Sequence, residues 1–269
     1  MTLNFVKMSG AGNDFVLVDN RQRGIELSTA RIVRLCDRHH GIGADGLILL
    51  VPCASGKADW AWQFYNSDGS PGEMCGNGAR CFARFVQRLT GARDKLSFET
   101  GAGVITALFQ SSRVTVNLTD PKDLRTGFDL PLSTGVEKAN FVNTGVPHAV
   151  LFVPDVEKVM VRQLGAEIRR HPHFGPRGTN VNFAQVLARN SIRVRTFERG
   201  VEGETLACGT GVSAAALVSS QVHGFDSPVR VRVQSGAQLD VSFEKDGARL
   251  HNVQLSGPAE FVFEGTIEI

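Results

Sequence analysis

The sequence lacks the features that mark several common classes of protein. Its 269 residues carry a formal net charge of only +2, and this balance argues against a protein that follows the phosphates of a nucleic acid. Apolar runs such as Leu47–Val51 are far too short to span a bilayer and suit buried strands. The N-terminal segment has no long apolar stretch, so no secretory signal is expected. With 42% hydrophobic and 21% charged residues, the chain is predicted to be a soluble globular protein that binds neither nucleic acid nor membrane.

The cysteine patterns of disulfide, zinc and redox proteins are missing as well. The five cysteines are an odd number without a Cys-x-x-Cys pair, which favours a reducing, cytoplasmic location. Cys75 and Cys81 have no second Cys/His pair at zinc spacing, so no metal site is expected. No Ser/Cys-His-Asp order indicates a hydrolase, and no glycine-rich loop lies in a β-α-β context that would bind a nucleotide. We therefore expect neither a metal nor a cofactor.

What the chain does contain is an internal repeat at an offset of about 135 residues. The matching segments are SGAGNDFVLVD (9–19) with TGVPHAVLFV (144–153), GADGLILL (43–50) with GTNVNFAQV (178–186), CGNGA (75–79) with CGTGV (208–212), and ETGAGVITALF (99–109) with QSGAQLDVSF (234–243). Four matches in one order at nearly constant spacing predict two homologous domains of ordinary size. We place them at residues 1–118 and 119–254, with a strand within 255–269 returning to complete the first domain.

Each half is expected to fold as strands around one central helix. Apolar residues at helical spacing predict these helices over Gly78–Leu89 and Gly211–Val222. A further helix is expected over Val156–His171, and the Asp-, Pro- and Gly-rich segment Lys122–Pro131 is expected to be a connection. Because the elements do not alternate regularly as β-α-β, we predict an α+β protein of two pseudo-symmetric domains. Each would be a mostly antiparallel β-sheet or barrel wrapped around its helix.

The repeated Cys-Gly-x-Gly loop, at Cys75 and Cys208, predicts an anion-binding site. Small residues that enter a helix present backbone amides at the positive end of the helix dipole. Glycines let a ligand approach that backbone closely. A cysteine at this place lies in a positive local field that favours its thiolate. Burial in the core is the usual fate of an unpaired cysteine, and we assign it to Cys36, Cys53 and Cys81, which lack this context.

Two such loops related by a pseudo-twofold would bring two cysteines to opposite faces of one carbon atom. One, as thiolate, would remove a proton, and the other, as thiol, would return a proton to the opposite face. The helix ends would hold an α-carboxylate and stabilise the negative charge of an enediolate-like transition state. We therefore assign Cys75 and Cys208 as the catalytic residues of a racemase. A non-enzymatic thiol sensor, in which the two cysteines form a regulatory disulfide, is the alternative from another class.

Five motifs together resemble one enzyme family over nearly the whole chain. They are KMSGAGNDF, GIGADG, NSDGSPGEMCGNGAR, GTNVNF and ERGVEGETLACGTG. This combination is similar to that of the diaminopimelate epimerases, whereas proline racemases and phenazine-type isomerases share the fold but not the combination. The resemblance implies an isomerase that interconverts LL- and meso-2,6-diaminopimelate, a dicarboxylic diamino acid, without pyridoxal phosphate, for lysine and peptidoglycan precursor biosynthesis. It also implies a homodimer. A racemase of another amino acid on the same fold stays open.

The resemblance implies roles for further residues. Those whose backbone amides would hold the reacting carboxylate are Gly76, Asn77, Gly209 and Thr210. Those that would bind the distal end of the substrate are Asn13, Asn66, Asn180 and Arg199. Glu198 would lie beside the reacting centre with His148 as its counterpart, and both stay open between acid/base support of the cysteines and orientation of the substrate.

These residue types suit such a substrate. Arg199 offers a bidentate cation to a carboxylate, and asparagine offers a donor and an acceptor together. Two residues depart from the family pattern: Val146 stands where the family often has Asn, and Gly46 where many members have Gln. Both departures remove a side-chain contact. They leave open how the distal pocket binds its substrate, but they do not change the expected class of reaction.

Overall fold

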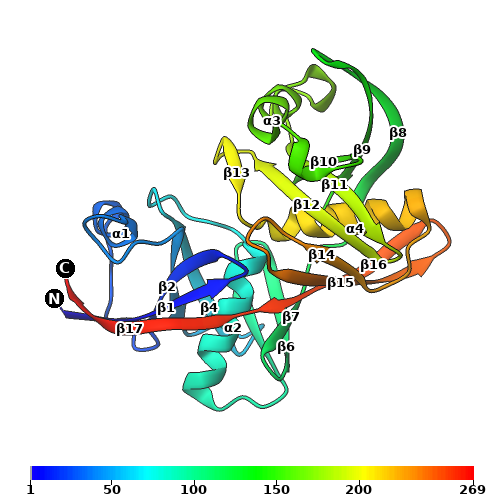
Figure 1. Ribbon diagram of the computed structural model, residues 1–269. Coiled ribbons are helices and arrows are strands. Elements are labelled where there is room, and N and C mark those ends of the chain that lie inside the picture. Colours follow the sequence, from blue (N-terminus) through cyan, green and yellow to red (C-terminus); the bar gives the residue numbers. More distant parts are fainter. Residues whose placement is uncertain (1) are drawn as a thin grey trace. The chain divides into compact units, whose positions relative to one another are not determined.

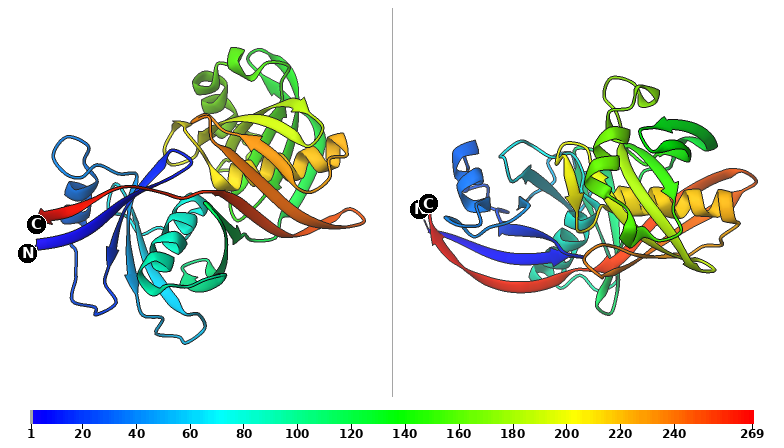
Figure 2. Two further views of the ribbon diagram at one scale, coloured as in Figure 1. Left: turned by 60° about the horizontal axis from the view of Figure 1, so that its bottom comes forward. Right: turned by 45° about the horizontal axis from the view of Figure 1, so that its top comes forward.

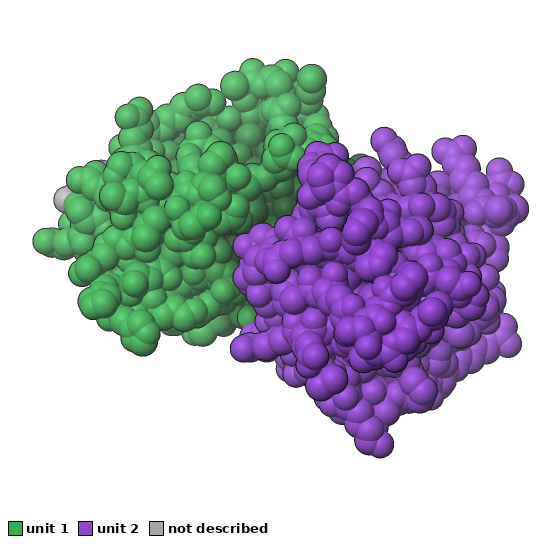
Figure 3. All heavy atoms as spheres, turned by 90° about the horizontal axis from the view of Figure 1, so that it is seen from above, with its two compact units in different colours: residues 1–116, 257–269 green, residues 117–256 purple. Residues whose placement is uncertain are grey.

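The structure is a computed structural model and describes residues 2–269 (Figure 1). The chain divides into two compact units (Figure 3). Unit 1 comprises Met1–Val116 together with Gly257–Ile269, and unit 2 comprises Asn117–Ser256. Within residues 2–269, no helix has the length and apolar character that a membrane crossing requires.

Unit 1 is a curved sheet around helix α2 (Gly76–Thr90). Its strands are β1 (Thr2–Gly10), β2 (Asn13–Asp19), β3 (Gly46–Val51), β4 (Trp60–Asn66), β5 (Lys95–Thr100), β6 (Gly103–Gln110), β7 (Arg113–Asn117) and β17 (Glu260–Glu268). Helix α1 (Thr29–Cys36) lies between β2 and β3 in the sequence. Helix α2 is capped by Gly91, whose φ of 72° gives the left-handed conformation that glycine adopts without a steric penalty. Figures 1 and 2 show β1 and β17 side by side, which their antiparallel pairing explains.

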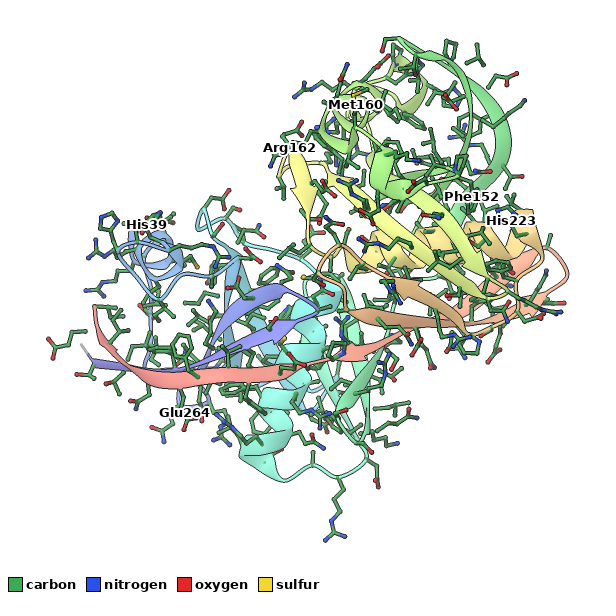
Figure 4. All side chains as sticks on the ribbon, viewed as in Figure 1. His39, Phe152, Met160, Arg162, His223 and Glu264 are labelled. Atoms are coloured by element: carbon green, nitrogen blue, oxygen red, sulfur yellow. The ribbon has the colours of Figure 1, made fainter. Side chains whose placement is uncertain are left out.

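Unit 2 has the same plan around helix α4 (Gly209–His223). Its strands are β8 (Lys122–Leu132), β9 (Gly135–Asn143), β10 (Pro147–Phe152), β11 (Asn180–Ala188), β12 (Ser191–Glu198), β13 (Gly203–Thr205), β14 (Val229–Arg232), β15 (Gln238–Asp246) and β16 (Arg249–Pro258). Helix α3 (Val161–Arg169) lies between β10 and β11 in the sequence. At the C-terminal end of α4, the ring of His223 packs edge-on against Phe152 of β10 with a centroid distance of 4.4 Å (Figure 4).

The strand pairing repeats from one unit to the other. In unit 1 the order is β17-β1-β2-β3-β4-β5-β6-β7, and the β2–β3 and β4–β5 pairs are parallel while the other pairs described are antiparallel. In unit 2 the order is β8-β9-β10-β11-β12-β14-β15-β16, with the parallel pairs β10–β11 and β12–β14 at the same places. Strand β17 thus has in unit 1 the position that β8 has in unit 2. The predicted α+β class, with mostly antiparallel sheets around a helix in each half, is confirmed.

Two sequence predictions of secondary structure were wrong, and Cys53, expected in the core, is only half-buried. The segment Lys122–Pro131 is not a connection but most of strand β8, which pairs with β9. Its turn-forming residues mark irregularities within the strand: Asp123 and Gly127 have positive φ, and the pairing register shifts on either side of Arg125. The helix expected over Val156–His171 is divided into a 3₁₀ turn (Val156–Lys158) and α3, because Val159 is extended between them.

Candidate active site

Cys75 and Cys208 occupy the same place in the two units, the residue immediately before the central helix. Each has an extended backbone, with φ and ψ of −146° and 116° at Cys75 and −117° and 110° at Cys208. The carbonyl oxygen of each cysteine accepts the first helical hydrogen bond, at 2.8 Å, from Ala79 or Val212. The first glycine of each motif, Gly76 or Gly209, is therefore the first helical residue, where backbone N–H groups point out of the helix.

The second glycine of each motif lies in close packing within its unit. A Cβ atom on Gly211 would lie 2.3 Å from Oδ1 of Asn182, a distance that no real contact shows. A Cβ atom on Gly78 would lie 3.2 Å from Cδ1 of Ile48, which is tighter than most real contacts. These glycines let the first turn of each helix press against the sheet, so the motif serves helix packing in addition to any ligand.

In unit 1, an amide network surrounds the thiol of Cys75. Sγ of Cys75 accepts from the backbone N–H of Gly78 at 3.5 Å and donates to Oδ1 of Asn13 at 3.6 Å. The same oxygen accepts from Nδ2 of Asn77 at 3.4 Å, and the amide nitrogen of Asn13 donates to the carboxylate of Asp45. The structure therefore brings together Cys75, Asn77 and Asn13, whose side-chain oxygen is directed at the thiol.

Ion pairs hold the Asn13 side of this network in place. Asp14 follows Asn13 and contacts Lys7 and Arg38, each at 2.8 Å, and Arg38 also contacts Asp45 at 2.8 Å. Burial raises the pKa of Asp14, but hydrogen bonds from Arg38 and Lys7 outweigh it and hold this pKa well below its usual range. The carboxylate of Asp14, next to Asn13, thus stays ionised at neutral pH.

A buried cation lies beneath the first turn of α2. The side chain of Arg80 is fully buried and donates to Oδ1 of Asn77 at 2.9 Å, to the carbonyl oxygen of Gly76 at 3.2 Å and to that of Pro258 at 3.3 Å. Burial lowers its pKa to about 10. Arg80 is therefore still charged at neutral pH, in a position that favours an anion at the start of the helix.

In unit 2, the predicted site residues lie at the start of α4 and at the ends of β10, β11 and β12. Sγ of Cys208 lies 3.6 Å from Oγ1 of Thr210, whose carbonyl oxygen accepts from Oγ1 of Thr144 at 3.0 Å. Oδ1 of Asn180 accepts from the backbone N–H of Arg199 at 2.9 Å, and its Nδ2 donates to the carbonyl of Pro147 at 3.0 Å. These contacts fix the segment that carries Arg199 against the end of β10.

A concentration of positive charge surrounds Arg199. Burial lowers the pKa of its guanidinium, and the positive charges of Arg169 and Arg177 lower it further. Arg169 is tied to Glu202 by an ion pair of 2.9 Å, and Glu198, the neighbour of Arg199, accepts from Oγ1 of Thr205. Such a group of guanidiniums suits the carboxylate of a ligand.

The two residues that depart from the family pattern, Gly46 and Val146, have different surroundings. Gly46 is buried in β3, where a Cβ atom would lie 2.7 Å from the carbonyl oxygen of Tyr65 and 2.8 Å from Cε2 of Phe64. This position leaves no room for a side chain. Val146 is half-buried, and its carbonyl oxygen accepts from the backbone N–H of Thr144 at 3.1 Å. Asn66 is the last residue of β4 and pairs with Gly46, and its Nδ2 donates to Oγ of Ser70 at 3.0 Å.

The structure adds several residues to the surroundings of the predicted site residues that the sequence alone did not indicate: Lys7, Asp14, Arg38, Asp45, Arg80, Asn182 and Thr196. Lys7, Asp14, Asp45, Arg80 and Asn182 belong to the quoted motifs, which was the available signal. Within residues 2–269, no three His, Cys, Asp or Glu side chains are grouped so that they could hold a metal ion.

Solved structures with low sequence identity to this chain have a similar fold. A phenazine biosynthesis protein of the PhzF family from Bacillus anthracis matches with a TM-score of 0.77 and 16% identity over 100% of both chains. A hydroxyproline epimerase from Agrobacterium vitis, solved with bound trans-4-hydroxy-L-proline, matches with a TM-score of 0.71 and 15% identity over 99% of this chain and 92% of that one. The protein therefore has the fold of these proteins, with a cysteine at the head of each central helix.

The particular family follows from closer relatives. The profile of the family described as diaminopimelate epimerase matches residues 5–123 and 140–262. Proteins named diaminopimelate epimerase from Aquifex aeolicus and from a Hydrogenobaculum species are 45% and 43% identical to this chain. The first alignment covers 98% of both chains, and the second covers 97% of both. The chain belongs to the diaminopimelate epimerase family, which confirms the resemblance found in the motifs.

Proposed function

We propose that the protein is an isomerase that converts LL-2,6-diaminopimelate to the meso isomer, in lysine and peptidoglycan precursor biosynthesis, through a thiolate and a thiol. Cys75 and Cys208 would act on opposite faces of the α-carbon, and the first-turn amides Gly76, Asn77, Gly209 and Thr210 would hold the α-carboxylate. The observation that carries this proposal is the equivalence of the two cysteines, each at the head of the central helix of its unit, in a chain of the diaminopimelate epimerase family.

The remaining predicted residues would hold the rest of the substrate. Arg199 supplies the cation for the distal carboxylate, and its neighbourhood of positive charge supports this role. Asn13, Asn66 and Asn180 would orient the distal end with hydrogen bonds, and Glu198 would lie next to the reacting carbon. His148 lies on β10 of unit 2, the unit that carries Cys208, and would act beside that cysteine.

Solvent deuterium provides the test. The purified protein, with its thiols reduced and without added cofactor, is expected to epimerise LL-diaminopimelate in D₂O and to place deuterium at the α-carbon of the product. Mass spectrometry and a stereochemical assay of the product would follow both events. Absence of both deuterium incorporation and meso product would refute the proposal.

A racemase of another amino acid is the second candidate, because Gly46 leaves no room for the side chain that many family members carry there. A panel of L-amino acids in the same assay would separate the two. Faster exchange with a monocarboxylic amino acid than with diaminopimelate would favour the second candidate.

We further propose that the protein works as a homodimer in the cytoplasm. The five cysteines form no disulfide among the residues described, which is consistent with a reducing compartment. Strand β17 supports a second copy as its partner, because Phe261, Val262 and Phe263 are 40%, 56% and 49% exposed on both faces of the strand. Exposed apolar residues of this kind on a strand are usually covered by another chain.

Disruption of this strand should dissociate the dimer. The Val262→Lys variant is expected to elute as a monomer in light scattering coupled to gel filtration, whereas the wild-type protein elutes as a dimer. The control is Thr266→Lys, which adds the same charge to the same strand outside the apolar segment. A wild-type monomer, or a Val262→Lys dimer as stable as the wild type, would contradict the proposed interface.

A further inference from the structure

A chain of three buried polar side chains crosses unit 2. His148 lies on β10, Asn182 on β11 and Thr196 on β12, and their side chains are 0%, 0% and 4% exposed. Asn182 stands directly opposite Thr196 in the antiparallel pair, so the two side chains share one face of the sheet. The same face is turned towards the first turn of α4, where Gly211 leaves room for Oδ1 of Asn182.

The direction of each hydrogen bond in this chain is determined. Oγ1 of Thr196 donates to Oδ1 of Asn182 at 3.0 Å, so the amide oxygen of Asn182 is turned towards Thr196. Nδ2 of Asn182 then donates to the carbonyl oxygen of Ala149 at 2.9 Å and meets Nδ1 of His148 at 3.1 Å. Because an amide nitrogen can only donate, Nδ1 of His148 is the acceptor and the ring proton is on Nε2.

The Nε2–H group of His148 has no hydrogen-bond partner among residues 2–269, although it is fully buried. A buried donor left in this state is costly, so a folded protein retains it where a ligand or a function compensates. Burial lowers the pKa of His148 to about 3, and the positive charge of Arg199 contributes to the shift. The ring is therefore neutral at physiological pH, and its only proton is on the unpartnered nitrogen.

We propose that Asn182 and Thr196 are positioning residues that hold His148 as a neutral Nε2–H donor, and that this N–H donates to the reacting carboxylate of the bound amino acid. The identity of the ligand rests on the proposed function, whereas the assignment of the ring proton does not. In this arrangement His148 neither accepts nor releases a proton. Its hydrogen bond strengthens as negative charge moves onto the carboxylate, which lowers the barrier to removal of the α-proton.

The arrangement is specific to unit 2. In unit 1 the second glycine of the motif, Gly78, faces the apolar atoms of Ile48 and Phe15, where Gly211 faces an amide oxygen. The two cysteines therefore have different polar surroundings. Asn13 places an oxygen at Cys75, whereas in unit 2 the hydrogen bonds from Thr196 end at the ring of His148.

Nitrogen NMR of histidine-labelled protein tests the tautomer without any substrate. In the wild type, the His148 ring is expected to show a bare Nδ1 and a protonated Nε2, with the signals assigned by their loss in His148→Gln. In Asn182→Asp, the carboxylate can only accept, so the proton is expected to move to Nδ1 or a second proton to bind. Thr196→Val should produce part of the same change, because the amide of Asn182 loses its anchor.

Ser219→Ala is the matched control. It removes a fully buried hydroxyl of unit 2 that donates to the carbonyl oxygen of Ala215. This hydroxyl takes no part in the hydrogen bonds between Thr196, Asn182 and His148, so the His148 signals are expected to stay unchanged. A proton on Nδ1 in the wild type would overturn the assignment. Unchanged His148 signals in both Asn182→Asp and Thr196→Val would overturn it as well.

Kinetics test the contact with the ligand. Asn182→Asp is expected to lower kcat for epimerisation about 100-fold and to change KM less than about threefold, since the lost interaction is strongest in the transition state. In a His148→Gln background the same substitution should cost much less, because no tautomer is left to fix. A moved proton with unchanged kcat would overturn the donor role. The expected wild-type tautomer in a protein without epimerase activity would refute the proposed function and still support the tautomer.

Discussion

Cys75→Ala and Cys208→Ala are each expected to lower kcat/KM for diaminopimelate epimerisation at least about 1,000-fold. Each thiol is proposed to serve one face of the α-carbon, so a variant with one cysteine can remove a proton or return one but cannot invert the centre. General acid–base groups contribute about 10²–10⁴ in rate, and residues that act as a unit lose most of the effect at the first removal. The double variant should therefore be little worse than either single variant.

The chain supplies a matched control for this experiment. Cys81 lies on the same helix as Cys75 but is fully buried, and burial raises the pKa of its thiol to about 12. Cys36 is buried too, with its pKa raised to about 11 by burial. Cys81→Ala and Cys36→Ala should thus keep kcat within about threefold of the wild type. A single variant at Cys75 or Cys208 that retains a tenth of the wild-type activity would exclude the two-base mechanism.

The repeat in the sequence carries most of the information about the fold. Segments about 135 residues apart form strands that pair with equivalent strands in their own units. The reason is that each copy of the apolar pattern must cover its own central helix. The pattern could not show that the Asp-, Pro- and Gly-rich segment forms strand β8. There the sequence signals a turn at Asp123 and Gly127, and pairing with β9 makes these residues irregular positions inside a strand. Long-range pairing outweighs local preference at this point.

The candidate site divides in the same way. The cysteines could be found because their motif is short, repeated and made of residues with a distinct chemical use. Arg80 and Asn182 could not be assigned roles, since an arginine on a helix and an asparagine in a strand have many common uses. Their roles depend on the side chains that they contact: Arg80 donates to Oδ1 of Asn77 in unit 1, and Asn182 donates to His148 in unit 2. Such contacts join residues that the sequence alone does not bring together.

Arg80→Leu is expected to destabilise the start of α2 by about 3 kcal/mol. The substitution leaves three oxygen acceptors, on Asn77, Gly76 and Pro258, without the cation that now donates to them, and each lost partner costs about 1–3 kcal/mol. Removal of a costly buried charge offsets part of this loss. Hydrogen exchange of the α2 amides measures the effect within unit 1, where a single unfolding midpoint for two units would be ambiguous.

The same variant should also change the chemistry of Cys75, because it removes the positive charge beside the thiol. The pH at which Cys75 reacts half-maximally with iodoacetamide is expected to rise in Arg80→Leu and to rise less in Arg80→Lys, which keeps a charge but not the forked geometry. Arg84→Leu is the control, since this half-buried arginine lies one turn further along α2 and bonds to Gln87, Ser111 and Arg113. Equal exchange protection of the α2 amides in Arg80→Leu and Arg84→Leu would show that Arg80 does not support the helix start. An unchanged pH of half-maximal alkylation in both variants would show that it does not favour the thiolate.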